Sequence, residues 1–324
     1  MLHKLSRIFK IFTFIIEYIR DFKCFIKHNG FSPFEPLEKR LSNKTIIETH
    51  TVEKGLSLPN PKPYFGQNKV RDLLSMNSNW TPPKSDLSRT MLLGALRDYV
   101  NEFNNIPPPD QELLARVKKF IKVEDIEAAR GGVKLIDKDY ISYKPEVISF
   151  LENRHSSRNF SDAPLSNDDI ESVISLSQAA PSQCNRQASR VHVFRDKKVI
   201  KNLLDLQSGA RGFSDVVPTL FVITSELTAW GGPQQRNQPY VDGGIFSNML
   251  LLSLSAHGFI NCPLNLALLH DTENKIKAVA NIPARERLIL MVAAGSPPDT
   301  EIKAANSPRW DSSYIYKIHD GDIS

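Results

Sequence analysis

The chain has 324 residues, of which 41% are hydrophobic and 24% charged, a balance typical of one large or two smaller globular domains. The net charge of +5 is local, because residues 1–30 hold six Lys or Arg and two Asp or Glu, so we expect no nucleic-acid partner. The three cysteines form no CxxC pair, which argues against a disulfide framework or a zinc site and favours a reducing, cytoplasmic setting.

The N-terminal stretch 2–27 predicts a basic amphipathic helix. Apolar residues recur there every three or four positions, and Asn29-Gly30 is a suitable stop. The most apolar run, residues 11–16, is far shorter than the ~20 residues that span a bilayer, and Lys10 and the lack of a cleavage site argue against a signal peptide. Two interpretations stay open: the helix packs on protein, its own or a partner subunit, or it lies on the anionic inner face of a membrane.

Residues 31–147 form an N-terminal extension that we expect to be part helical and part irregular. Five prolines between positions 59 and 83 argue against long regular elements over 31–84. Apolar periodicity predicts helices over 86–103 and 110–121, separated by three consecutive prolines. Residues 122–150 are mixed, with turns at Gly131-Gly132.

From residue 152 the pattern changes to alternating helices and strands. Ser166 and Asp169 are typical of a helix start with a capping box. The predicted helices that follow span 199–206, 240–257 and 272–280, and the predicted strands span 191–194, 219–224 and 288–293. The helix over 240–257 is apolar enough to be buried on most sides, with Gly258 as its C-terminal cap.

Familiar catalytic signatures are absent from the chain. It contains no GxGxxG, GxxxxGK[ST], HExxH or GxSxG, and its histidines do not cluster at metal-ligand spacing. Instead, Arg154-His-Ser-Ser-Arg-Asn-Phe160 places two guanidinium groups and hydroxyls within five residues, a set of donors that suits a phosphate monoester. A single RxxxR pair is more often simply solvated.

A second polar segment follows the helix that Ser166 begins. Ala180-Pro-Ser-Gln-Cys-Asn-Arg-Gln187 offers backbone groups, a hydroxyl and amides, which can hydrogen-bond the edge of a flat heteroaromatic ring. Taken alone, it is also what an ordinary turn between a helix and a strand looks like.

In combination, these segments resemble the start of nitroreductase-family domains. Later segments agree in order, and the resemblance covers about half of the chain: Val217-Pro218, Tyr240–Asn248, Ala256–Asn265, Leu288–Pro297 and Ser307-Pro-Arg309. The resemblance implies an α+β fold, a nitroreductase-like three-layer sandwich with a central mixed sheet flanked by helices over residues 148–310. It also implies a homodimer with one FMN at each subunit interface. A tail, 311–324, follows.

The resemblance assigns three groups of FMN-binding residues. Arg154, Ser156, Arg158 and Arg309 would hold the phosphate and ribityl oxygens, with His155 near the ring or ribityl chain. Pro181, Ser182, Asn185 and Gln187 would border the isoalloxazine ring. Pro263, Leu264 and Asn265 would pack on the other side of the ring and offer hydrogen bonds near N5.

The implied activity is that of an FMN-dependent oxidoreductase that passes hydride from NAD(P)H to a small organic acceptor. The flavin carries this chemistry, so we expect no protein nucleophile, no metal, and Cys184 and Cys262 as small buried residues. Within the loop 230–239, Trp230 and Arg236 either gate the substrate or form a dimer contact. The alternative is a non-catalytic or cryptic flavin-fold protein that acts at a membrane surface or in complex assembly, including surface-polysaccharide assembly.

Overall fold

The computed structural model describes residues 2–79, 82–83, 85–123, 129–135, 144–305 and 307–319; the side chains of residues 2–11, 79 and 123 are not described. The chain begins with α1 (Leu2–His28) and the helices of the extension, α2 (Leu37–Leu56), α3 (Gln67–Asn79), α4 (Leu87–Glu102) and α5 (Gln111–Val123). The second half contains α6 (Pro145–Glu152), α7 (Asn167–Ser177), β1 (Ser189–Phe194), α8 (Lys197–Gln207), β2 (Thr219–Glu226), α9 (Gln238–Ala256), β3 (Ile260–Asn265), α10 (His270–Ala280) and β4 (Glu286–Gly295).

The four strands form one sheet with the order β1-β2-β4-β3, and each neighbouring pair runs antiparallel. A single parallel bridge joins Ser156 to Asn261 at the β3 edge, so the predicted mixed sheet is mainly antiparallel. Strands β1 and β3 are the two outer strands, which places the segments next to them on opposite sides of the domain.

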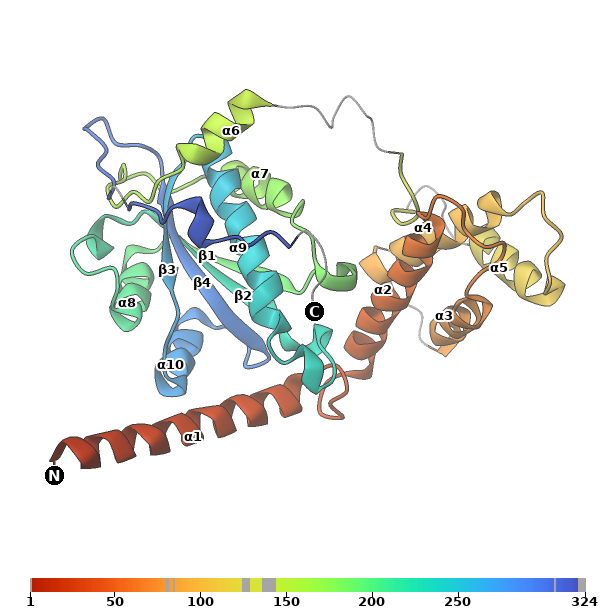
Figure 1. Ribbon diagram of the computed structural model, residues 1–324, viewed down its shortest axis with the longest axis horizontal. Coiled ribbons are helices and arrows are strands. Elements are labelled where there is room, and N and C mark those ends of the chain that lie inside the picture. The colour runs from red at the N-terminus through yellow and green to blue at the C-terminus, as the bar shows by residue number, and fades with distance from the viewer. Residues whose placement is uncertain are drawn as a thin grey trace.

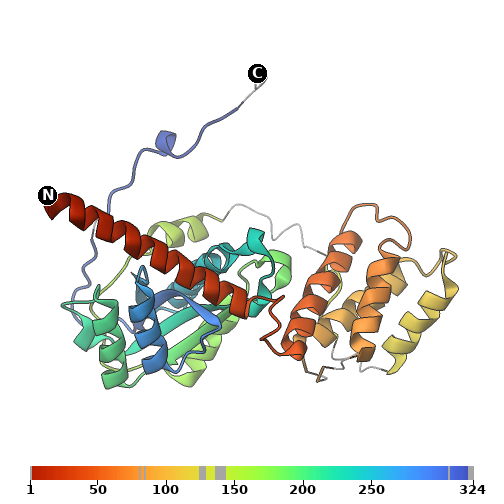
Figure 2. The same cartoon turned by 90° about the horizontal axis from the view of Figure 1, so that it is seen from below.

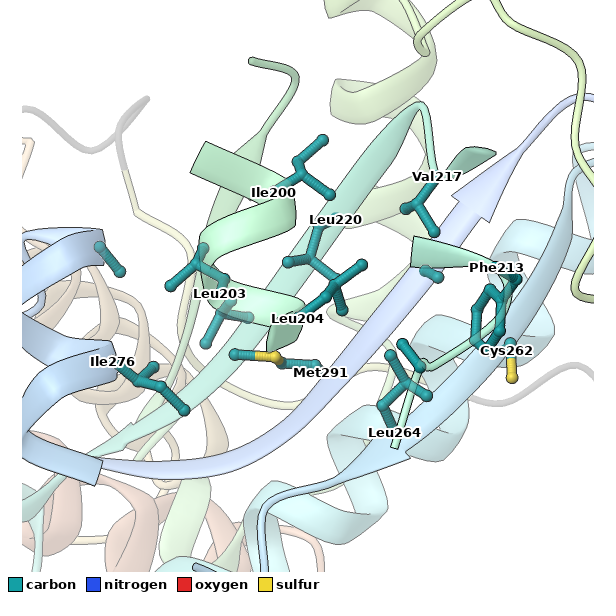
Figure 3. Close-up of a cluster of buried hydrophobic side chains, with 14 of the residues drawn as sticks. Ile200, Leu203, Leu204, Phe213, Val217, Leu220, Cys262, Leu264, Ile276 and Met291 are labelled. Carbon is teal, nitrogen blue, oxygen red and sulfur yellow. The ribbon is translucent and has the colours of Figure 1, made fainter. Parts of the chain in front are cut away.

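Helices cover both faces of the sheet and give the predicted three-layer α+β domain (Figure 1). On one face, Ile200, Leu203 and Leu204 of α8 point toward Leu220 of β2 and Met291 of β4 (Figure 3), and α10 completes this layer. On the other face, α7 and α9 cover side chains of the two central strands, including Phe221 and Val292. Strand residues alternate between these two cores, as the period of a strand requires.

The extension has a hydrophobic core of its own. Apolar side chains from α2 to α5 pack together there, and an aromatic cluster at its centre includes Tyr64, Phe65, Tyr99 and Phe103. The expectation of irregular chain over 31–84 is therefore wrong. The prolines lie in the connections that flank α3, where they interrupt no backbone hydrogen bond of a helix.

Helix α9 is less buried than its composition predicts. Leu250, Leu251 and Leu254 lie in the core, but Tyr240, Val241 and Ile245 are exposed. The helix is apolar on all sides, so a single chain covers only the side that faces the sheet. This corrects the expectation that the helix is buried on most sides, and it leaves an apolar surface uncovered.

Helix α1 lies along the outside of the body beside α10 (Figure 1), and residues 311–319 of the tail run away from the body (Figure 2). No helix in the described part of the chain combines the length and apolar content needed to cross a bilayer.

Candidate functional site

The arginine segment runs along the outer edge of β3. The backbone N–H of Ser157 donates to the carbonyl of Asn261 at 3.0 Å, and that of Ser161 donates to Ser296 at 3.0 Å. Between these bonds, Phe160 is buried in the sheet core. The segment is therefore fixed at both ends, with Arg154, Ser156 and Arg158 at alternating positions of an extended chain.

All five residues predicted to hold the phosphate and ribityl oxygens line one cavity of about 280 Å³. They are Arg154, His155, Ser156, Arg158 and Arg309, and the remaining lining residues are Glu152, Ala305 and Ser307. Arg309 comes from the far end of the chain and donates to the carbonyl of Ser307. Three guanidinium groups face one carboxylate here, so the cavity is cationic.

In the part of the chain that the structure describes, the arginines of this cavity are not neutralised. Among the described residues, none of the three forms an ion pair, and Nη1 of Arg154 is buried without a hydrogen-bond partner. An unpaired buried donor on a charged group costs free energy that a bound anion would recover. The donor set and the orphaned nitrogen both fit the phosphate of FMN.

Cys262 lies in the core beneath this cavity. Burial raises the pKa of its thiol, and the nearby Arg158 and Arg154 only partly oppose that shift. The thiol is thus protonated at neutral pH, as expected for a buried apolar side chain and not for a nucleophile.

The polar turn 180–187 has an unusual backbone. Cys184, Asn185 and Gln187 all have positive φ, a conformation that costs free energy in residues other than glycine. The turn is held by the hydroxyl of Ser182, which accepts from the N–H of Gln187 at 2.9 Å, and by Asp242 of α9, which accepts from the N–H of Gln183 at 2.9 Å.

Asp242 is a functional candidate that sequence reasoning missed. It is buried, at 4% exposure, near the start of a mostly apolar helix. A single acidic residue in such a helix was the sequence signal that could have identified it.

Pro181, Ser182 and Gln187 line a second, larger cavity of about 740 Å³ between the turn and the extension. Its wall on the extension side includes Lys39 and Asn43 of α2. Asn185 lies outside this cavity, and its amide contacts Sδ of Met91 in α4 at 3.6 Å. The extension therefore covers one side of the turn.

The third predicted group lies on β3 and lines neither cavity. The side chain of Leu264 points into the core next to α8 (Figure 3), so only its backbone could contact a ring. Pro263 is half-buried and Asn265 is exposed, with its carbonyl accepting from Nε2 of Gln207 at 2.9 Å. Strand alternation directs the side chain of Leu264 inward, and the position of Pro263, Leu264 and Asn265 beside the ring stays a prediction.

Within one chain, the arginine cavity and the polar turn lie apart. Next to the arginine cavity, Asn261 of β3 pairs with Ala294 near the end of β4. Next to the polar turn, Ser189 of β1 pairs with Ser225 of β2, and Ser225 pairs with Arg287 near the start of β4. The two sites thus lie at opposite corners of the sheet, separated by ~24 Å along the strands and ~14 Å across them.

Trp230 is a core residue and not a gate. Its side chain is fully buried, its Nε1 donates to Ser225 at 3.1 Å, and the guanidinium of Arg186 lies 5.2 Å from the ring centre. Arg236 in the same loop donates to the carbonyl of Pro233 at 3.1 Å and is exposed.

The family comparison covers the segment that holds both polar motifs. Residues 151–210 match the model of the nitroreductase family. Over that segment the chain resembles the nitroreductase family. A candidate NADH dehydrogenase/NAD(P)H nitroreductase of Archaeoglobus fulgidus is 23% identical over 158 residues, which are 87% of that protein and 48% of this chain. About half of the chain therefore lies outside the match.

Solved structures that resemble this chain include a nitroreductase-like protein of Streptococcus mutans, which is 21% identical with a TM-score of 0.48. The match covers 54% of this chain and 98% of that one. An FMN-dependent nitroreductase of Clostridium difficile R20291 is 20% identical with a TM-score of 0.45, and the match covers 54% of this chain and 99% of that one.

Proposed function

We propose that this chain is an FMN-dependent oxidoreductase that takes hydride from NAD(P)H and reduces a small organic acceptor. The observation that carries the proposal is the cavity of Arg154, Ser156, Arg158 and Arg309, in which a buried guanidinium nitrogen has no hydrogen-bond partner among the described residues. The family match to residues 151–210 supports it.

The proposed site contains residues of two copies of the chain. One copy supplies the arginine cavity for the phosphate, and the other supplies Ser182, Asn185 and Gln187 for the edge of the ring. Two observations support this arrangement. The two groups lie at opposite corners of one sheet, and Tyr240, Val241 and Ile245 leave an apolar surface on α9 that a second copy could cover.

Each group has a separate task in this proposal. The arginines bind the phosphate through charge-assisted hydrogen bonds and so fix the position of the ring. The polar turn, held in a strained conformation by Asp242 and Ser182, presents preorganised donors to the ring edge where negative charge develops on reduction. Bound FMN would accept a hydride and pass electrons to the acceptor.

The test begins with the small molecule that the full chain carries. Purified protein is denatured, and the released compound is identified by mass spectrometry. We expect FMN, and we expect the native protein to show flavin absorbance that bleaches with NADH or NADPH. A protein that releases no flavin and does not bind added FMN would overturn the proposal and favour the non-catalytic alternative.

A further inference from the structure

Helix α1 is attached to the body by its acidic side. Glu17 contacts His270, whose backbone nitrogen and Nδ1 both lie 2.8 Å from the same carboxylate oxygen. Asp21 forms an ion pair with the buried Arg287 at 2.9 Å, and Arg20 forms one with Asp271 at 3.0 Å. The acids at positions 17 and 21 are thus occupied by the body.

Two further residues, Cys24 and His28, continue this contact side toward the C-terminal end of the helix. Cys24 packs against the cluster around Trp230, and His28 lies 2.5 Å from Glu35. Positions 17, 21, 24 and 28 have the spacing of a single stripe along a helix. This stripe anchors α1 over its last three turns.

The opposite side of α1 is apolar and exposed. A residue two positions earlier lies ~200° around a helix, so the stripe 15, 19, 22, 26 faces away from the stripe 17, 21, 24, 28. Phe22 is 63% exposed and Ile19 46% exposed. We call this surface the outer face, and it consists of Phe12, Ile15, Ile16, Ile19, Phe22 and Ile26.

The free charges next to the outer face are basic. Lys23 and Lys27 are exposed and form no ion pair among the described residues. An apolar stripe with a cationic margin results, because both acids of the helix point inward.

We propose that the outer face of α1 binds an anionic membrane surface. Exposed aromatic and branched aliphatic side chains would enter the boundary between headgroups and acyl chains, while the lysines lie at the level of the headgroups. A second copy of the chain is a poorer occupant, because two such faces would bring Lys23 and Lys27 near their own counterparts without an acid between them.

The test uses the full chain and vesicle flotation. Wild-type protein is mixed with phosphatidylcholine vesicles, either alone or with about 30% phosphatidylglycerol. The variant Ile19→Ser/Phe22→Ser removes apolar surface from the outer face, and Lys23→Gln/Lys27→Gln removes its charge. The matched control Leu58→Ser/Val279→Ser removes exposed apolar side chains elsewhere. All of these positions are exposed, and circular dichroism checks that each variant is folded.

We expect wild type and control to float with the anionic vesicles. Each outer-face variant should bind these vesicles at least about tenfold more weakly than wild type. Wild-type protein that floats with neither vesicle, or outer-face variants that bind like the control, would overturn the proposal. The proposal would also be overturned if the outer-face variants bound vesicles like wild type but had a smaller oligomer mass in solution. That result would mean that the outer face joins two copies of the chain. Flavin content plays no part in this readout, so the result is separate from the fate of the proposed oxidoreductase function.

Discussion

The carboxylate of Glu17 lies 2.8 Å from both the backbone nitrogen and Nδ1 of His270, 253 positions away in the sequence. His270 is the first residue of α10, and Leu269, the residue before it, has no side chain that can cap the helix. Glu17 therefore caps α10 from another helix and places a negative charge at its N-terminus, where the helix dipole favours one.

We expect Glu17→Ala to loosen α1. Loss of the cap removes about 1 kcal/mol from the contact between α1 and α10. Hydrogen exchange followed by mass spectrometry should then show faster exchange in residues 12–28 and in the first turn of α10. Glu171→Ala, an exposed acid on α7, is the control. Equal exchange in the two variants would contradict a capping role for Glu17.

Stability should fall in acid because of Glu286. Burial alone would raise the pKa of this glutamate, but hydrogen bonds from His192 at 2.7 Å and Thr224 at 2.6 Å outweigh burial, and the pKa lies below its ordinary range. The pKa values of Glu17 and Glu273 are lowered as well. A lowered pKa stabilises the fold above the unfolded-state value, near pH ~4.3, and this contribution is lost as the pH falls through the folded-state value.

Urea unfolding at a series of pH values measures this effect. The midpoint should drop as the pH falls below about 4, and Glu286→Gln should lower the midpoint at neutral pH and flatten its pH dependence. A variant with the same pH slope as wild type would show that Glu286 does not contribute.

Arg154→Ala should weaken FMN binding more than Arg309→Ala. A charge-assisted hydrogen bond contributes about 1.5–3 kcal/mol, or roughly a 10- to 150-fold change in Kd. Arg154 has the buried nitrogen and should be near the upper end, whereas Arg309 is exposed and should be near the lower end. Titration calorimetry measures both, with the exposed Arg211→Ala as control. Unchanged affinity in both variants would exclude this cavity as the phosphate site.

Gly94→Val should destabilise the extension. A Cβ atom at Gly94 would lie 2.1 Å from the carbonyl oxygen of Gly131, which packs directly on α4. We expect a loss of about 1–3 kcal/mol on thermal unfolding, because neither backbone can move without breaking the bond from Arg130 to Thr90. Asn101→Val places the same residue on the exposed side of α4 and should have little effect.

Local signals were read correctly from the sequence, and relationships set by packing were not. Ser166 and Asp169 form the expected capping box because both partners lie within one turn. Apolar periodicity predicted α1 as a helix but could not predict which side of it would face the body. The acidic side faces inward because His270 binds Glu17 and Arg287 binds Asp21. No local pattern marked Trp230 as a core residue, since its partners come from α1 and from Arg186.

The candidate site shows the same division. The arginine cavity could be predicted because Arg154, Ser156 and Arg158 are close in sequence, and Arg309 was added by the resemblance alone. The distance between this cavity and the polar turn depends on the strand order β1-β2-β4-β3, which the separate motifs do not contain. The prolines at 59, 61 and 63 misled because they end one helix and precede the next.

In the proposed dimer, the placement of the arginine cavity and the polar turn at opposite corners of the sheet has a consequence for complementation between variants. Arg154→Ala and Asn185→Gly, which keeps the left-handed backbone, would each disable both sites of a dimer. A mixed dimer would carry both substitutions at one site and none at the other. When equal amounts of the two inactive variants are unfolded and refolded together, about half of the dimers are mixed. Activity should therefore return in about one site in four. Complementation of this kind requires that every complete site is shared between two chains.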